Sequence, residues 1–230
     1  DLVKLQTFKP ENMTLKTYKN RFVVKEGLWK NKSLYDLYEK GQTPYSWHKK
    51  IFNSAKKNRI GCFSTPFHES DVDFLEKLKC PIYKVASFEL NHIPLIKKIA
   101  TTKKPIILST GMANLNEIET AFNIAKRNGA REIIILYCVS NYPAKNTDFN
   151  LNNIGFLKNK FKCRVGLSDH SNDNEIVKAA VASGATIIEK HIALRGEKKS
   201  LDYNFSLKDK EIKVFKNDMV RTHDLKGKNF

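Results

Sequence analysis

The sequence lacks any apolar run close to the roughly 18 to 20 residues that a membrane-spanning helix needs, and its charged, polar-interrupted start does not resemble a signal peptide. Cysteine is also scarce. The four cysteines, Cys62, Cys80, Cys138 and Cys163, form no CxxC pair, which argues against a zinc site or a disulfide framework. We therefore expect a cytoplasmic protein with reduced thiols and no membrane partner.

Arginine is rare for so basic a chain. Seven of the 41 basic residues are Arg, which leaves 34 Lys, and with 24 acidic residues the net charge is +17. The lysines lie singly or in pairs along polar helix faces, without an arginine-rich stripe or interleaved aromatic residues. This pattern favours a solvated surface that attracts small anions over a nucleic-acid-binding surface, so we predict no nucleic-acid partner.

Hydrophobic residues make up 41% of the 230 residues, enough for a sizeable core. Short β-branched runs predict strands at 2–7, 61–65, 82–87, 106–110, 132–140, 165–168 and 186–191. Amphipathic stretches between them predict helices at 45–59, 69–79, 115–128 and 174–183. This alternation is typical of a parallel sheet, either an open doubly wound sheet or a (β/α)8 barrel. An open sheet of the dinucleotide-binding type carries a GxGxxG turn after an early strand, and this sequence has no such turn.

Polar residues end nearly every predicted strand, and in a barrel these ends form one ring around one mouth. They include Gln6, Thr7, Ser64, Thr65, Ser87, Glu89, Ser109, Thr110, Ser140, Ser168, Asp169, His170, Glu189, Lys190 and His191. The fold class that we predict is therefore α/β, a TIM (β/α)8 barrel. Seven strands are counted instead of eight, so we expect the first barrel strand to be missing from the chain.

Two lysines, Lys4 and Lys84, lie inside apolar strands. A buried ammonium needs an anion, which is either an internal carboxylate or a ligand in a wet cavity. Hydroxyl groups at neighbouring strand ends favour a ligand that carries a phosphate and a carboxylate. These hydroxyls belong to Thr65, Ser87, Ser109 and Ser168.

Glu89 and two histidines are the other candidates for chemistry. Glu89 is either a carboxylate at a helix N-terminus or a group that moves a proton to or from a sugar oxygen. His170 and His191 end consecutive strands, where two imidazoles suit an open site for Mn²⁺, or less well for Mg²⁺ or Fe²⁺. The remaining histidines are interpreted as surface residues: His48, His68, His92 and His223.

With these residues in place, the chain resembles the sialic acid (nonulosonic acid) synthases. The matching motifs are VKLQTF (3–8), CFSTPF (62–67), YKVASFELNHIPLI (83–96), KPIILSTGMA (104–113), YCVSNYP (137–143), GLSDHS (166–171), GATIIEKH (184–191) and LDYNFSL (201–207). The insertion with GLW (27–29) and TPYSWH (43–48) is similar to the pseudaminic acid synthase branch. Tyr203 and Ser140 depart from the neuraminate-type pattern, which has His and commonly Asn there.

The resemblance implies a reaction in which phosphoenolpyruvate condenses with an N-acetylated amino sugar to give a nonulosonic acid and phosphate. It implies catalytic roles for Glu89, Lys84 and His191, and metal ligation by His170 and His191. The substrate-binding positions that it implies are Lys4, Thr65, Lys84, Ser87, Ser109, Ser168, Tyr142 and Asp202.

The resemblance also implies a domain organisation. Residues 1–230 are expected to form the catalytic barrel from strand two to strand eight with the following helix, without the small C-terminal antifreeze-like (SAF) domain. The full-length protein is expected to be a homodimer. Four alternatives stay open: an N-acetylneuraminate or legionaminate synthase, a deoxy-octulosonate phosphate synthase, a catalytically inactive barrel used as a scaffold, and a basic nucleic-acid-binding protein.

Overall fold

The structure is a computed structural model that describes residues 1–227. The chain divides into two compact units: unit 1 comprises Asp1–Leu108 and Leu115–Ile133, and unit 2 comprises Ser109–Asn114 and the chain from residue 134 onward. Both units alternate parallel strands with helices, which confirms the predicted α/β class. None of the helices in the described part of the chain combines the length and the apolar character needed to cross a membrane.

Unit 1 is built on four strands, which pair in parallel and in chain order. They are β1 (Leu2–Thr7), β2 (Gly61–Pro66), β3 (Tyr83–Val85) and β4 (Ile106–Ser109), of which the last residue belongs to unit 2. Most of β2 and all of β3 are buried, because helices and loops cover both faces of a parallel sheet.

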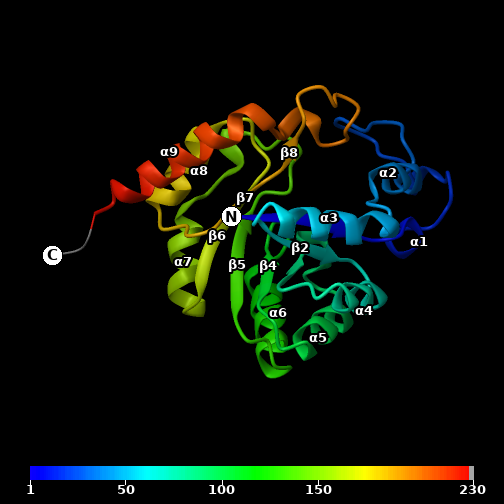
Figure 1. Ribbon diagram of the computed structural model, residues 1–230, viewed down its shortest axis with the longest axis horizontal. Helices are drawn as coiled ribbons and strands as arrows, with labels where there is room; N and C mark the ends of the chain where they lie inside the picture. Colours follow the sequence, from blue (N-terminus) through cyan, green and yellow to red (C-terminus); the bar gives the residue numbers. More distant parts are fainter. Residues whose placement is uncertain (228–230) are drawn as a thin grey trace. The chain divides into compact units, whose positions relative to one another are not determined.

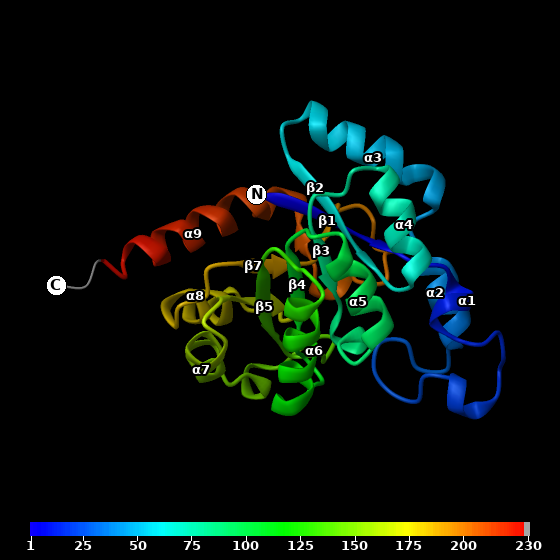
Figure 2. The ribbon, with the colours of Figure 1, turned by 90° about the horizontal axis from the view of Figure 1, so that it is seen from below.

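The helices of unit 1 pack against these strands through apolar faces. They are α1 (Pro10–Met13), α2 (Leu34–Gly41), α3 (Tyr45–Lys57), α4 (Glu69–Lys77), α5 (Ile93–Thr101) and α6 (Leu115–Arg127). Figure 1 shows α4, α5 and α6 side by side, and Figure 2 shows α3 and α4 beside β2. In α5, the spacing of Leu95, Ile96 and Ile99 places all three on one face, and all three are fully buried.

Unit 2 contains three longer parallel-sheet strands and two short ones. They are β5 (Ile133–Cys138, whose first residue belongs to unit 1), β6 (Arg164–Asp169), β7 (Ile188–Lys190), β8 (Ile192–Ala193) and β9 (Leu207–Lys208). Its helices are α7 (Asn152–Phe161), α8 (Asn174–Ala182) and α9 (Ile212–Asp224). Strand β6 pairs in parallel with β5 and with β7, β8 pairs with β9, and α9 packs along α8 (Figure 1).

Five short 3-10 helices complete the described elements: Asn20–Phe22, Ser87–Glu89, Asn146–Asp148, Tyr203–Phe205 and Asp209–Glu211. All seven predicted strands and all four predicted helices are present, with ends that differ by a few residues. The structure adds the helices α1, α2, α5, α7 and α9, and the two-residue strands β8 and β9. Closure into an eight-stranded barrel remains a prediction.

The interpretation of His48 as a surface residue is wrong. Its side chain on α3 is fully buried, with Nε2 2.8 Å from Thr7 Oγ1 and Nδ1 3.1 Å from the Pro44 carbonyl. Thr7 Oγ1 in turn lies 2.6 Å from Ser64 Oγ, so a chain of hydrogen bonds joins α3 to the ends of β1 and β2. Burial lowers the pKa of His48, and backbone hydrogen bonds act in the opposite direction.

Candidate active site

The register of unit 1 brings two lysines and a threonine to one face of its strands. Lys4 on β1 lies opposite Phe63, and Gln6 lies opposite Thr65 on β2. Because alternate residues share a face, Lys4 and Thr65 point to the same side. The next strand pairs Tyr83 with Ser64, which places Lys84 level with Thr65 on that same side. Lys84 is only 5% exposed, so its ammonium lies inside the protein as expected.

Glu89 ends the short 3-10 helix that directly follows β3. Burial raises the pKa of its carboxyl to about 7, while the positive charge of Lys84 and a backbone hydrogen bond act to lower it. Its Oε2 atom is buried without a hydrogen-bond partner in the described structure, and so is Oγ1 of Thr65. Buried polar atoms are almost always paired in folded proteins, so these two atoms indicate a place for a polar ligand.

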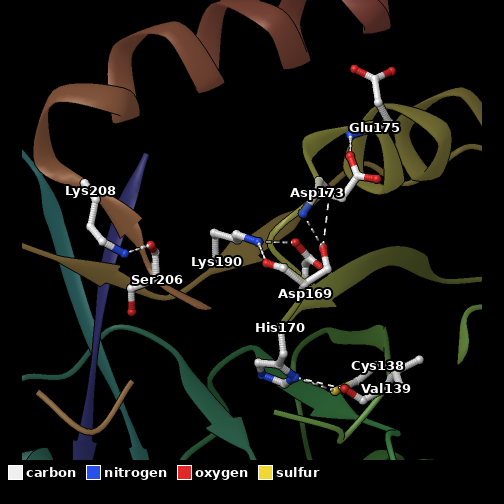
Figure 3. Close-up of polar contacts among 10 residues, drawn as sticks. Cys138, Val139, Asp169, His170, Asp173, Glu175, Lys190, Ser206 and Lys208 are labelled. Atoms are coloured by element: carbon white, nitrogen blue, oxygen red, sulfur yellow. Dashed lines mark hydrogen bonds and ion pairs between the residues drawn. The ribbon is translucent and has the colours of Figure 1, made fainter. Parts of the chain in front are cut away.

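Unit 2 places the two predicted metal-binding histidines close together. His170 directly follows β6 and His191 directly follows β7, and their ring centroids lie 5.3 Å apart. His170 Nδ1 lies 2.9 Å from the Val139 carbonyl oxygen, and His191 Nδ1 lies 2.8 Å from Asp202 Oδ2 (Figure 3 shows the first contact). Because both partners are acceptors, Nδ1 carries the proton in each neutral ring, and the lone pair is on Nε2.

The serines of unit 2 differ in their partners. Ser168 is buried, and its hydroxyl donates to Glu189 Oε1 at 3.0 Å. Ser109 is equally buried, yet its Oγ atom has no hydrogen-bond partner in the described structure. Ser109 thus shares with Thr65 and Glu89 a buried polar atom that has no partner among residues 1–227.

Comparison with known proteins places these residues in a family. The sequence profile of the NeuB family matches residues 1–229. The chain belongs to the NeuB family. The expected resemblance to sialic acid synthases is thereby confirmed.

The NeuB relatives include proteins of two sugar specificities. A pseudaminic acid synthase from Campylobacter jejuni subsp. jejuni serotype O:2 is 44% identical over 214 residues, which cover 93% of this chain. An N,N'-diacetyllegionaminic acid synthase from the same strain is 41% identical over 217 residues, again 93% of this chain. The NeuB chain described here spans 62% of the first relative's length and 65% of the second's.

A solved structure supports the fold of this NeuB chain. The crystal structure of an N-acetylneuraminic acid (sialic acid) synthetase from Leptospira borgpetersenii serovar Hardjo-bovis, in complex with citrate, aligns with a TM-score of 0.88 at 30% identity. The alignment covers 100% of this chain and 75% of that one.

The donor set of the NeuB chain fits a divalent metal ion at His170 and His191. A metal-binding imidazole typically donates its other ring N–H to a carboxylate or a backbone carbonyl, which fixes the tautomer. His191 meets this requirement through Asp202, and His170 through Val139. Within residues 1–227 no group of three or more His, Cys, Asp or Glu side chains is arranged to hold a metal, so these two imidazoles would leave further coordination positions to water or substrate.

Asp202 has a hydrogen-bond role that the sequence did not indicate. The resemblance implies a contact with the sugar, whereas in the structure its carboxylate hydrogen-bonds to His191. A carboxylate in this position orients the imidazole and raises its basicity as a ligand.

Phe205 was missed by the sequence reasoning, although it lies in the quoted motif LDYNFSL. It is 1% exposed, and its ring centroid lies 5.3 Å from that of His191 and 6.1 Å from that of His170. Tyr142 packs in the same group, with its centroid 4.3 Å from that of His170 and 5.4 Å from that of Phe205. Two aromatic side chains therefore pack against the imidazoles, Phe205 against both and Tyr142 against His170.

Proposed function

We propose that the protein carrying this chain condenses phosphoenolpyruvate with an N-acetylated amino sugar of the 2,4-diacetamido-2,4,6-trideoxy-altrose type, giving pseudaminic acid and phosphate. The observation that carries the proposal is the set of buried, unpaired polar atoms in the described structure. All three belong to residues that the sequence assigned to substrate binding or catalysis, namely Thr65, Glu89 and Ser109. The identity of 44% to a pseudaminic acid synthase supports this choice of product.

The anionic substrate is assigned to the lysines and hydroxyls. Lys4 and Lys84 are the proposed cations for the carboxylate and the phosphate of phosphoenolpyruvate. Lys84 is buried and Lys4 is partly exposed on the same side of the strands, and ammonium groups shielded from water bind anions strongly. The hydroxyl groups that complete the proposed site belong to Thr65, Ser87, Ser109 and Ser168. Holding both ends of the molecule fixes the direction from which its carbon 3 attacks.

The proposed reaction forms one carbon–carbon bond and releases one phosphate. Carbon 3 of phosphoenolpyruvate attacks the aldehyde carbon of the open-chain sugar, which leaves carbon 2 with oxocarbenium character. Glu89 has a pKa of about 7 and is partly protonated at neutral pH, so it gives a proton to the oxygen that was the aldehyde. Water adds to carbon 2 and releases a proton, which balances the proton given by Glu89, and the tetrahedral intermediate loses phosphate to give the 2-keto acid.

His170 and His191 are the proposed holders of a divalent ion, Mn²⁺ in preference to Mg²⁺ or Fe²⁺. When bound, the ion supplies Lewis-acid polarisation of the sugar aldehyde oxygen. The protein's own contribution is to present both imidazoles in the Nδ1–H tautomer, through Asp202 and the Val139 carbonyl. The proposal includes the (β/α)8 barrel as the catalytic architecture and a homodimer as the assembly.

A legionaminate synthase is the second candidate, because the 41% identity to such an enzyme is close to the first value. Either candidate reaction would use the residues proposed above, and the two reactions differ in the stereochemistry of the sugar.

The test measures phosphate release from phosphoenolpyruvate with Mn²⁺ across a panel of N-acetylated amino sugars. We expect release with the altrose-type sugar to exceed release with N-acetylmannosamine and with the legionaminate precursor. A preference for the legionaminate precursor would support the second candidate. Absence of release with every sugar, from protein that binds phosphoenolpyruvate, would support the inactive scaffold instead.

A further inference from the structure

A buried ion pair joins the strand ends that carry His170 and His191. Lys190, the last residue of β7, contacts the carboxylate of Asp169, the last residue of β6. Their side chains are 7% and 0% exposed, and the two residues are direct partners in the parallel register. Each charged residue therefore immediately precedes one of the two histidines.

The same lysine also contacts Ser171, the residue that follows His170. Its Nζ donates to the Ser171 carbonyl as well as to Asp169, so it bridges the residues before and after His170 (Figure 3). Asp169 Oδ1 accepts a hydrogen bond from the Ser171 backbone N–H at 3.0 Å, which closes a tight turn around His170. The His170 carbonyl oxygen in turn accepts from the Ala144 N–H at 3.1 Å.

The ion pair and the histidine ring use opposite sides of the chain. In Figure 3, the Lys190 and Asp169 side chains point toward each other, whereas the His170 ring points away from them toward Cys138 and Val139. The pair consequently contributes no ligand atom of its own. Its contacts restrain the backbone of His170 and the distance between the two strand ends, since both are tied to one ammonium group.

We infer that Lys190 and Asp169 are positioning residues that hold His170 and His191 at the separation that one metal ion requires. The inference rests on the proposed metal site at the two histidines. If the ion pair served only to stabilise the fold, mutations would have a different effect on metal binding. Breaking a buried pair leaves an uncompensated charge and destabilises the fold, whereas replacing both partners with uncharged residues of similar volume removes that cost.

The experiment separates these two roles with a single and a double variant of the full chain. Lys190→Met breaks the pair, and Asp169→Asn with Lys190→Met removes both charges. Mn²⁺ affinity is measured on chelator-treated protein from the paramagnetic resonance signal of free Mn²⁺, and stability from thermal unfolding without metal. Lys178→Met is the matched control, because Lys178 forms an exposed pair with Glu175 on α8 of the same unit.

We expect the single variant to lose stability and to bind Mn²⁺ at least about 10-fold more weakly, the range typical for loss of a group that orients a ligand. In the double variant we expect the melting temperature to return most of the way while Mn²⁺ affinity stays at least about 10-fold reduced. The control should match the unsubstituted chain in both measurements. Mn²⁺ affinity that returns together with stability in the double variant would overturn the inference.

A His170→Ala/His191→Ala variant distinguishes this inference from the proposed function. If the unsubstituted chain binds Mn²⁺ and the double-alanine variant binds equally well, the proposed metal site itself is wrong, and the inference falls with it. If the double-alanine variant loses binding while the Lys190 variants keep it, only the positioning role is wrong.

Discussion

Glu89 combines a buried carboxyl with a nearby positive charge, and burial outweighs that charge. Its pKa rises to about 7, so the folded protein takes up a proton that the unfolded chain, with an ordinary Glu pKa, does not hold between about pH 4.5 and 7. The stabilisation linked to this proton is therefore complete below about pH 4.5 and is lost as the pH rises through 7.

Replacing this carboxyl removes the titration. The unsubstituted chain loses the stabilisation linked to the Glu89 proton between pH 5 and pH 8, and the Glu89→Gln variant does not. We therefore expect the free energy of unfolding of the variant to rise by up to about 3 kcal/mol relative to that of the unsubstituted chain over this range. Phosphate release should fall by about 10²- to 10⁴-fold, as for loss of a proton-transfer group. Urea unfolding at both pH values tests the first statement, with the exposed Glu197→Gln as control. A pH-independent difference in stability would contradict the raised pKa.

Lys84 differs from the exposed lysines in its surroundings. It is 5% exposed on a short strand, whereas Lys199 is exposed in a turn. We expect Lys84→Ala to weaken phosphoenolpyruvate binding by about 10- to 100-fold, the range for loss of a hydrogen bond to a charged group, and Lys199→Ala to leave binding unchanged. Calorimetric titration with phosphoenolpyruvate measures both. Equal effects from the two substitutions would remove the assignment of Lys84 to the anion site.

At the scale of elements, β6 depends on a close approach to the segment before β7. A Cβ atom on Gly166 would lie 2.1 Å from the Ile187 carbonyl oxygen and 2.8 Å from a Leu136 methyl carbon, closer than atoms can pack. Glycine therefore allows β6 to lie against both neighbours, in the middle of the strand that ends at Asp169 and His170.

We expect Gly166→Ala to destabilise the fold by about 1 to 3 kcal/mol, because β6 must move to relieve the contact. Gly155→Ala is the control, since a Cβ there meets nothing within 4 Å and Gly155 lies inside helix α7. Alanine at that position should be neutral or stabilise by up to about 1 kcal/mol. Thermal unfolding of the two variants measures the difference, and the same melting temperature for both would contradict the close approach.

For the whole molecule, the net charge of +17 favours the approach of anionic substrates. Salt screens this attraction, with a Debye length that falls from about 10 Å at 0.1 M to about 3 Å at 1 M. We expect the KM for phosphoenolpyruvate to rise several-fold between about 0.05 and 0.5 M salt. The KM for the uncharged amino sugar serves as the internal control and should stay nearly constant. A parallel rise of both values would point to a general effect of salt on the protein.

The sequence by itself determined the order of elements and identified most of the residues proposed for the site. β-Branched apolar runs separated by amphipathic stretches specified all seven strands of the predicted pattern, because local periodicity decides which face of an element is buried. The two strand lysines were identifiable for a related reason, since a charge within an apolar run needs a partner. Glu89 and the two histidines were identifiable as polar residues at strand ends, and the motifs spread over almost the whole chain added the roles that the resemblance implies.

Tertiary structure alone decided which distant residues became partners. Asp202 reaches His191, Lys190 reaches Asp169, and His48 is buried against Thr7 although its neighbour Trp47 is 57% exposed. The partners in these contacts lie between 11 and 41 positions apart in the chain. Their distances depend on strand register and on the rotation of a helix against its sheet, which packing of the whole unit sets and which no local pattern of residues records.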